Sequence, residues 1–248
     1  MLGIFNRNVY LADQLEGLID IHNHILPGID DGASNLDDSL ALLRAFNAFG
    51  VTDFVATPHM HSDLYPNTPD TITQAHALLL DELKRHPDLN RITIDRAAEH
   101  MIDSDYEEKL DQKTIMPLRR FYMLVEVSFL QPSINFDVAI TKTQNLGYYP
   151  ILAHPERYAF LHGDLSKYRA LKSQGIYFQV NLLSLAGHYG TSILKEATKL
   201  LKEGLVDFVG TDVHNMSHIQ SLKNAKINKG MKNALLRLKD RNSESFLS

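Results

Sequence analysis

The chain contains no cysteine among its 248 residues, and this absence excludes several kinds of chemistry at once. Without thiols there are no disulfides, no thiolate metal ligands and no cysteine nucleophile. A cysteine-free chain is also compatible with a cytoplasmic location. Tryptophan is absent too, whereas histidine occurs 12 times. Histidine, aspartate and glutamate are therefore the strong metal ligands that this sequence offers.

Long hydrophobic runs and blocks of like charge are missing as well. No apolar stretch approaches the roughly 20 residues of a membrane span, and the N-terminus lacks the apolar core and cleavage site of a signal peptide. Basic residues are mixed among acidic ones at a net charge of −5. We therefore expect neither membrane insertion nor nucleic-acid binding. The 44% hydrophobic content predicts one domain over residues 1–248, with residues 1–17 as an N-terminal extension packed on the body.

Seven short apolar segments alternate with helical patterns along the rest of the chain. We expect strands at 18–25, 53–57, 92–99, 121–128, 149–153, 176–181 and 206–211. We expect helices at 35–49, 70–85, 103–110, 135–146, 165–173, 191–203 and 221–239, after which the last residues should fray. Apolar strands that alternate with helices indicate an α/β fold whose parallel sheet is covered on both faces.

The first strand ends in the segment IDIHNHILPGIDDG. Alternate residues of a strand share a face, so His22 and His24 point the same way and can bind one metal ion. Beyond the strand, a turn presents two carboxylates, of which we interpret Asp31 as a ligand and Asp30 as a turn residue. Taken alone, this segment is equally typical of surface histidines before a polar loop.

Similar strand ends recur along the chain, and this recurrence favours the metal interpretation. The candidate ligands are His22, His24, Asp31, His59, Glu99, Glu126, His154, Asp212 and His214. They follow strands one, two, three, four, five and seven. A closed ring of strands brings that many strand ends to one point, whereas an open doubly wound sheet does not. We therefore predict a seven-stranded variant of the βα (TIM-like) barrel, with its site at the C-terminal rim.

Nine such groups exceed the four ligands that one zinc-like ion takes. They suit two or three divalent ions that share a bridging carboxylate. A sulfur-free set of imidazoles and carboxylates favours Mn, Fe, Zn or Co, and Mg is also compatible. Such clusters activate water and clamp the oxygens of a phosphate group.

Six segments together resemble a known family: IDIHNHILPGIDDG, ATPH, AAEH, LVEVS, AHPERY and GTDVHN. They are similar to the polymerase-and-histidinol-phosphatase (PHP) superfamily, and to its bacterial tyrosine-phosphatase branch of the CpsB and YwqE type. The resemblance covers most of the chain from Leu18 onward. It implies a distorted seven-stranded PHP barrel that hydrolyses protein phosphotyrosine with a metal-activated hydroxide, with Mn as the expected metal. The implied partner is a phosphotyrosine protein, such as a bacterial tyrosine kinase that controls capsule or exopolysaccharide assembly.

The resemblance also implies a division of the ligands among three ions. One ion would take His22, His24, Glu99 and Asp212; a second would take Glu99 as the bridge, with Glu126 and His154; a third would take Asp31, His59 and His214. Arg157 matches a family arginine that would hold the phosphate, with a rim salt bridge as its alternative role. Arg157, Asp212 and His214 are then the expected catalytic residues.

The sequence departs from the family where a second arginine can follow the last histidine. Here that loop reads NMSHIQSLK, and we expect either that His218 or Lys223 is the substitute or that the protein holds the phosphate more weakly. Tyr65 and Asn67 are candidates for the mouth of the site, whereas we expect His61 to be exposed. His100 should be structural or exposed.

Two other functions fit the same motifs. A phosphatase of a small phosphomonoester, such as histidinol phosphate, would need nearly the same site with different rim loops. A non-catalytic, metal-binding regulatory barrel belongs to another class of function and predicts that ligand positions are lost. None of the nine positions is lost, which favours an enzyme.

Overall fold

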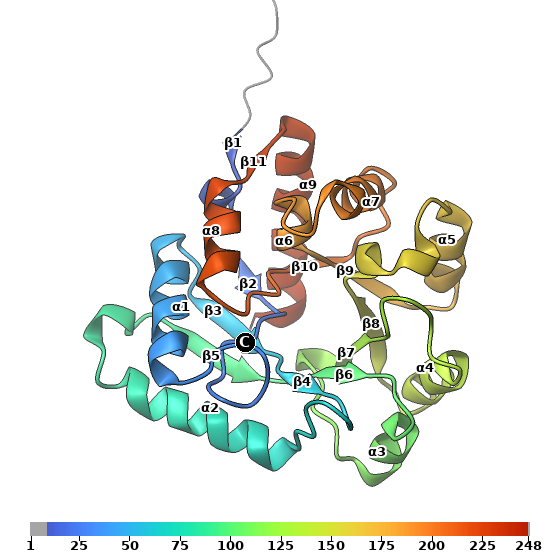
Figure 1. The fold of residues 1–248 in the computed structure, drawn as a ribbon, viewed down its shortest axis with the longest axis horizontal. Coiled ribbons are helices and arrows are strands. Elements are labelled where there is room, and N and C mark those ends of the chain that lie inside the picture. The colour runs from blue at the N-terminus through green and yellow to red at the C-terminus, as the bar shows by residue number, and fades with distance from the viewer. Residues whose placement is uncertain (1–8, 248) are drawn as a thin grey trace, which may run out of the picture.

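The computed structural model describes residues 9–247, and its centre is formed by two parallel sheets surrounded by helices (Figure 1). One sheet has six strands in the order β10 (Phe208–Gly210), β9 (Tyr177–Asn181), β8 (Tyr149–Ala153), β7 (Tyr122–Glu126), β6 (Glu99–Met101) and β4 (His59–Met60). The other sheet has three strands in the order β2 (Ile19–Asp20), β3 (Asp53–Ala56) and β5 (Thr93–Arg96). The predicted α/β fold with parallel strands is therefore confirmed.

Among residues 9–247 the strands do not form the single seven-stranded barrel that we predicted. The predicted strand at 53–57 is observed as β3, and after Thr57 and Pro58 an unpredicted short strand, β4, follows it. The predicted strand at 92–99 is divided at Ala97 and Ala98 into β5 and β6. Pro58 has no N–H to donate to a ladder, which disfavours a continuous strand there. The pairing continues through these breaks, because the Ala97 N–H donates to the Ala56 carbonyl at 2.8 Å and the Glu99 N–H donates to the Pro58 carbonyl at 3.1 Å. The result is a curled six-stranded sheet that continues into the smaller one.

The first and last strands of the ring, β2 and β10, do not pair with each other in the described residues. Side chains join them instead. The Asp20 carboxylate accepts hydrogen bonds from the Thr211 N–H at 2.9 Å and from its hydroxyl at 2.6 Å. Nearer the rim, an isolated parallel bridge joins Asn23 to Val213. Backbone polar groups buried along this seam are thus satisfied without a regular ladder.

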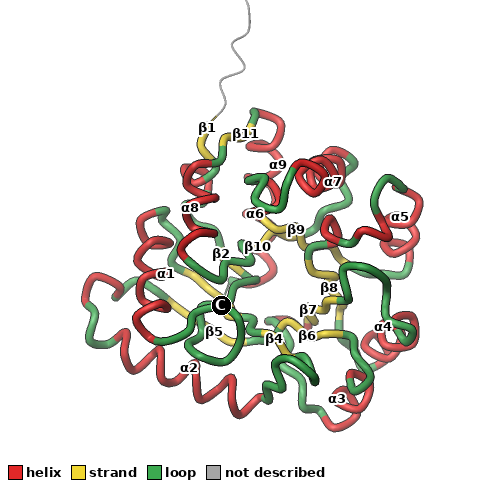
Figure 2. The backbone as a smooth tube through the Cα atoms, in the orientation of Figure 1, coloured by secondary structure: helices red, strands yellow, loops and turns green. Residues whose placement is uncertain are grey.

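The outer helices lie close to their predicted positions (Figure 2). They are α1 (Leu36–Ala48), α2 (Pro69–Leu83), α3 (Tyr106–Gln112), α4 (Phe136–Asn145), α5 (Leu165–Ser173) and α7 (Thr191–Lys202). Asn35 caps α1 by accepting from the Asp38 N–H, and Thr68 forms a capping box with Thr71 at the start of α2. The short helix α6 (Leu182–Leu185), directly after β9, was not predicted.

The predicted tail helix at 221–239 is wrong in its bounds. The structure has α8 (Met216–Asn224), a short strand β11 (Lys226–Ile227) and α9 (Lys229–Phe246). The side chains of Asn215 and Asn228 cap the two helices, and each therefore starts a new helix where we expected one continuous element. Strand β11 pairs antiparallel with β1 (Val9–Tyr10) of the N-terminal extension, whose first eight residues lie outside the described part.

Within the described residues, the C-terminal helix α9 does not fray as predicted. Phe246 is fully buried in the apolar cluster inside the curled sheets. Its ring packs at 5.1 Å from that of Phe208 and 5.3 Å from that of Tyr122. Helix α9 therefore covers the end of the strands that lies opposite the candidate ligands. Within residues 9–247, no helix is both long and apolar enough to cross a membrane.

Candidate metal centre and substrate pocket

The structure brings all nine predicted ligand residues together at the C-terminal ends of the strands. Their ligand atoms form four overlapping groups, each within 4.8 Å. The groups are His24, Asp31, His59 and His214; His22, His24 and Asp212; His22, Glu99 and His154; and His59, Glu99 and Glu126. Because the groups share members, they form one continuous cluster of imidazoles and carboxylates.

Glu99, the first residue of β6, lies at the middle of this cluster and is fully buried. Its Oε2 atom is 3.2 Å from His22 Nε2 and 3.1 Å from His59 Nδ1. Its Oε1 atom is 3.0 Å from His154 Nε2. One carboxylate thus faces imidazoles from three different strand ends, which is the geometry that a bridging ligand requires.

Asp212 forms the second carboxylate of the inner part. Its Oδ1 atom lies 3.5 Å from His22 Nε2 and 3.4 Å from His24 Nε2. Asp212 and His154 both adopt a left-handed backbone conformation, with φ of 56° and 36°. Such conformations are costly for residues other than glycine and cluster at functional sites. Here they occur where β8 and β10 turn away from the sheet and direct side chains into the cluster.

The outer part of the cluster contains Asp31 and His214. Asp31 Oδ1 is 3.4 Å from the Nε2 atoms of both His59 and His214. His59 also faces the inner part, since its Nδ1 atom lies 3.0 Å from Glu126 Oε1. The family resemblance placed His59 with the third ion alone, whereas in this geometry its two nitrogens face two different groups of carboxylates.

A chain of hydrogen bonds from β9 orients the inner residues, and we did not predict it. Gln179 Oε1 accepts from His22 Nδ1 at 2.7 Å, and Gln179 Nε2 donates to Asn181 Oδ1 at 2.9 Å. Asn181 Nδ2 in turn donates to Asp212 Oδ2 at 2.6 Å. The signal was present in the sequence, because Gln179 and Asn181 are polar residues two apart in an otherwise apolar strand. Such contacts fix the tautomer and direction of a ligating imidazole.

Asp30 does more than form a turn, which corrects our interpretation. Its Oδ2 atom accepts from His24 Nδ1 at 2.8 Å and from the His59 N–H at 3.2 Å. Burial lowers the pKa of His24, but the Asp30 and Asp212 carboxylates together outweigh this effect, and the pKa is raised to about 10. Asp30 therefore orients His24 in the same way as Gln179 orients His22.

The inner atoms of the cluster are those expected of metal ligands. His22 Nε2, His24 Nε2, His59 Nδ1 and Glu99 Oε2 are buried and have no hydrogen-bond partner among residues 9–247. Buried polar atoms are normally paired, so four unpaired atoms facing one another call for an explanation. Although burial raises the pKa of Glu99, the neighbouring His22 and His59 imidazoles hold it well below its usual value. An ionised carboxylate surrounded by imidazole nitrogens is a donor set that fits divalent metal ions.

A pocket of about 450 Å³ opens above the cluster. Its floor includes Asp31, His59, Glu126, His154, Asp212 and His214. Its walls are largely apolar or aromatic, with Leu64, Tyr65, Met101, Phe129 and Tyr189. The Tyr65 ring stacks on the His59 ring at 5.3 Å, so Tyr65 lies at the mouth as predicted. Asn67 instead donates to the His59 carbonyl at 2.9 Å and supports the loop.

Arg157 lies in the wall of this pocket and contacts the cluster. Its Nη1 atom donates to Asp212 Oδ2 at 3.0 Å. The guanidinium carbon lies 4.4 Å from the centre of the Phe129 ring and 4.2 Å from that of Tyr189. The Tyr189 hydroxyl also donates to Asp212 Oδ2 at 3.2 Å. Arg157 is therefore held between two aromatic rings, with a salt bridge that leaves other N–H groups for a ligand.

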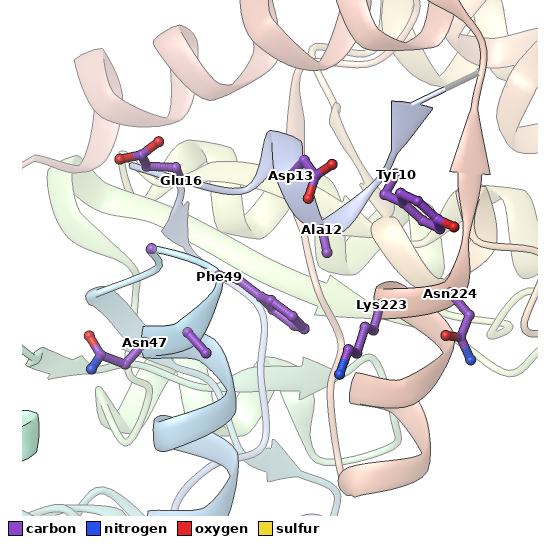
Figure 3. Close-up of a pocket in the computed structure, with 10 residues that line it drawn as sticks. Tyr10, Ala12, Asp13, Glu16, Asn47, Phe49, Lys223 and Asn224 are labelled. Carbon is purple, nitrogen blue, oxygen red and sulfur yellow. The ribbon is translucent and has the colours of Figure 1, made fainter. Parts of the chain in front are cut away.

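Only one of the two expected substitutes for the missing arginine is near the site. His218 lines the pocket, and its Nδ1 atom accepts from the His214 N–H at 3.2 Å. Lys223 lies in a separate groove of about 750 Å³ between the N-terminal extension and the ends of α1 and α8 (Figure 3). That groove is larger than the pocket over the cluster but contains none of the nine candidate ligands. The proposal of Lys223 as a substitute is thus wrong.

Two further histidines have structural surroundings. His100 is buried, its Nδ1 atom bonds to the Leu124 carbonyl at 3.1 Å, and its Nε2 atom accepts from the Met116 N–H at 3.1 Å. His61 lines the pocket and is only partly exposed, so our expectation of an exposed side chain is wrong. Its backbone forms a bridge with Tyr65, which shapes the loop after β4.

Comparison with known proteins places this cluster in a defined family. The chain is 31% identical over 202 residues to the tyrosine-protein phosphatase YwqE of Bacillus subtilis, covering 80% of this chain and 78% of that protein. It is 30% identical over 205 residues to the tyrosine-protein phosphatase CpsB of Streptococcus pneumoniae, covering 80% and 84%.

A crystal structure from work on YwqE and CpsB, described as unique metal-dependent tyrosine phosphatases, superposes with a TM-score of 0.81. The sequence identity is 27%, and the match covers 92% of this chain and 94% of that one. The family model for capsular polysaccharide synthesis, CpsB/CapC, matches residues 18–240. Since this match contains every residue of the cluster and of the pocket above it, the chain belongs to the CpsB/CapC family of capsular polysaccharide synthesis.

Proposed function

We propose that this protein is a metal-dependent phosphatase that hydrolyses phosphotyrosine on a protein substrate. The observation that carries the proposal is the set of buried, unpaired imidazole and carboxylate atoms around Glu99, directly below an arginine in an aromatic pocket. The match to two tyrosine-protein phosphatases over most of the chain supports it.

The cluster has enough ligands for two or three divalent ions. Glu99 is the proposed bridge, with His22, His24 and Asp212 on one side. The other ligands would be Glu126 and His154 for a second ion, and Asp31, His59 and His214 for a third. When bound, such ions lower the pKa of water and neutralise charge on phosphate oxygens. We propose manganese as the usual metal because the family resemblance implies it, and the sulfur-free set of imidazoles and carboxylates is compatible with manganese.

Arg157 is the proposed phosphate-binding residue. Its guanidinium is planar and carries five donors, which suits two oxygens of one phosphate group. Stacking between Phe129 and Tyr189 restricts its side chain before the substrate arrives. Less conformational freedom is then lost on binding, which favours affinity.

His218 is the proposed second donor to the phosphate. A neutral imidazole whose Nδ1 accepts a hydrogen bond must carry its proton on Nε2. The Nδ1 atom of His218 accepts from the His214 N–H, so its Nε2–H is free to act as a donor on the pocket side. This donor would take the place of the arginine that other family members can carry.

The pocket walls favour an aromatic phosphate ester. Tyr65, Phe129 and Met101 present apolar surface around the floor, and a phenyl ring would bury that surface against them. The imidazole and charged amine of histidinol phosphate would gain less from this apolar surface than a phenyl ring would. The substrate would thus be selected by its ring as well as by its phosphate.

The test compares a phosphotyrosine peptide with histidinol phosphate and a phosphoserine peptide on one protein sample. Metal content is measured before chelation, after chelation and after addition of Mn²⁺. We expect hydrolysis of the phosphotyrosine peptide that is lost on chelation and restored with the metal. Preference for histidinol phosphate would contradict the substrate class, and a metal-loaded protein inert to all three would favour a regulatory barrel.

The biological substrate that we propose is a bacterial tyrosine kinase of capsule or exopolysaccharide assembly. The proposal rests on the family, whose description is capsular polysaccharide synthesis. Such a kinase acts inside the cell, so we also propose a cytoplasmic location for this protein.

A further inference from the structure

A second hollow of about 330 Å³ lies beside the proposed catalytic pocket, between the β7–α4 loop and helix α5. Its lining is mainly apolar and includes Pro132, Ile134, Phe136, Phe160, Leu161 and Leu171. We call it the apolar groove. Its volume is at the lower end of the range for ligand sites, so it suits one or two side chains better than a whole cofactor.

The same two loops build the catalytic pocket and the apolar groove. The β7–α4 loop contributes Phe129 to the pocket and Ile134 to the groove. The loop after β8 contributes Arg157 to the pocket and Phe160 to the groove. The Ala159 N–H donates to the Phe129 carbonyl at 3.0 Å and joins the two loops. The two hollows are therefore adjacent parts of one surface.

Three aromatic rings set the distance between the hollows. The ring of Phe129 lies 6.0 Å from that of Tyr158, which lies 5.5 Å from that of Phe160. An extended peptide advances about 3.3 Å per residue, so two to four residues cover this path. A phosphotyrosine in the pocket would thus place a side chain a few positions away over the groove.

The surface around the apolar groove is unusually rich in exposed apolar side chains. Of the thirteen large apolar side chains exposed in the described residues, four lie between positions 129 and 138. They are Phe129, Leu130, Ile134 and Val138, with exposed fractions of 41%, 81%, 108% and 62%. Ile134 lines the apolar groove and Phe129 lines the catalytic pocket, so this segment offers exposed apolar surface to a partner at both hollows.

We propose that the apolar groove binds an apolar side chain of the phosphorylated protein, two to four residues from its phosphotyrosine. This inference rests on the proposed function and adds a determinant of substrate sequence to it. The substrate segment would run from the metal cluster past Phe129 to Ile134 and Phe160. Selection would then act on the residues beside the phosphotyrosine as well as on its ring.

The test uses phosphotyrosine peptides that carry leucine or serine at each position up to four residues from the phosphotyrosine. Free phosphotyrosine serves as the substrate that cannot reach the groove. We expect kcat/KM of wild type for the best leucine peptide to exceed that for its serine counterpart about tenfold, as is typical of filling a small apolar pocket.

Two variants alter the apolar groove without touching the catalytic pocket. Ala170→Phe adds a ring at an exposed position of α5 in the groove lining, and Ile134→Ser removes an exposed apolar wall. Both should abolish the leucine preference and leave hydrolysis of free phosphotyrosine unchanged. Leu78→Ser, at an exposed position of α2, is the matched control and should keep the preference.

Several outcomes would overturn this inference. Equal kcat/KM for leucine and serine peptides at every position would contradict it while leaving the proposed function intact. A variant that changes only the oligomeric state would show that the groove binds a second copy of the chain. If wild type hydrolyses neither free phosphotyrosine nor any of the peptides, the proposed function fails. In that case, fluorescence polarisation measures the binding of the same peptides and decides the inference. Equal affinities of the leucine and serine peptides would still contradict it.

Discussion

Arg157 and Asp212 form a salt bridge of 3.0 Å that connects the pocket wall to the metal cluster. Asp212 uses one oxygen for this contact and turns the other toward His22 and His24. The same carboxylate is also held by Asn181. The proposed phosphate-binding and metal-binding residues are therefore joined through Asp212, which uses a different oxygen atom for each.

Replacing Arg157 by alanine should impair catalysis and leave metal binding intact. We expect kcat/KM on a phosphotyrosine peptide to fall about 100-fold, as is typical when a preorganised donor is lost. Arg157→Lys should recover little of this loss, because an ammonium group cannot bind two oxygens in a fork. Metal content of the purified variants is the second readout, and Arg169→Ala, at a surface ion pair, is the control. A loss of bound metal would show that Arg157 has a structural role.

Replacing Glu99 by glutamine should remove the proposed bridge between ions. Turnover should fall at least about 1000-fold, as on loss of a group that acts in the transition state. The thermal midpoint of the metal-free protein should change little or rise, because a buried charge has been removed. Glu196→Gln is the matched control, since Glu196 is a buried carboxylate on α7 outside the cluster. Near-normal turnover of Glu99→Gln would contradict the bridging assignment.

His218 is predicted to donate a hydrogen bond to the phosphate from Nε2. His218→Ala should raise KM for a phosphotyrosine peptide about tenfold, the usual effect of losing a hydrogen bond to a charged group. His218→Gln should recover part of this loss, because its amide supplies a donor at a similar distance. His188→Ala is the control, because His188 packs edge-on against His218, with ring centres 4.6 Å apart, without lining the pocket. Unchanged kinetics of His218→Ala would show that this histidine does not take the role of the second arginine of the family.

Asn242 is predicted to stabilise the closure of the strands from helix α9. Its Nδ2 atom donates to the carbonyls of Ile19 at 3.0 Å and Val209 at 2.7 Å, and its Oδ1 atom accepts from the Val209 N–H at 3.3 Å. Asn242→Leu leaves these buried groups unpaired and should lower the free energy of unfolding by about 3 kcal/mol.

Chemical denaturation measures the effect of Asn242→Leu. Asn233→Leu makes the same change on the exposed face of α9, and we expect it to stay within about 0.5 kcal/mol of wild type. Equal stability of the two variants would show that the seam between β2 and β10 does not depend on this side chain.

The sequence alone was sufficient for features that depend on neighbouring residues. The side chains of Asn35 and Thr68 start α1 and α2, because a cap bonds to backbone groups two or three positions away. The bounds of β8 and α5 agree with those predicted, since apolar periodicity and the turn at Gly175 are local signals. The nine candidate ligands were found in the same way, from polar residues at the ends of apolar strands.

Tertiary structure decided everything that depends on contacts between distant parts of the chain. His22 and Gln179 are 157 positions apart, and no local pattern relates them. The position of Arg157 between Phe129 and Tyr189, the split of the strands near Pro58 and the burial of Phe246 depend in the same way on packing. Local backbone preferences are small beside the free energy of burying side chains and pairing buried polar groups. The chain therefore determines by itself which residues are available for chemistry, while the fold determines how they are oriented.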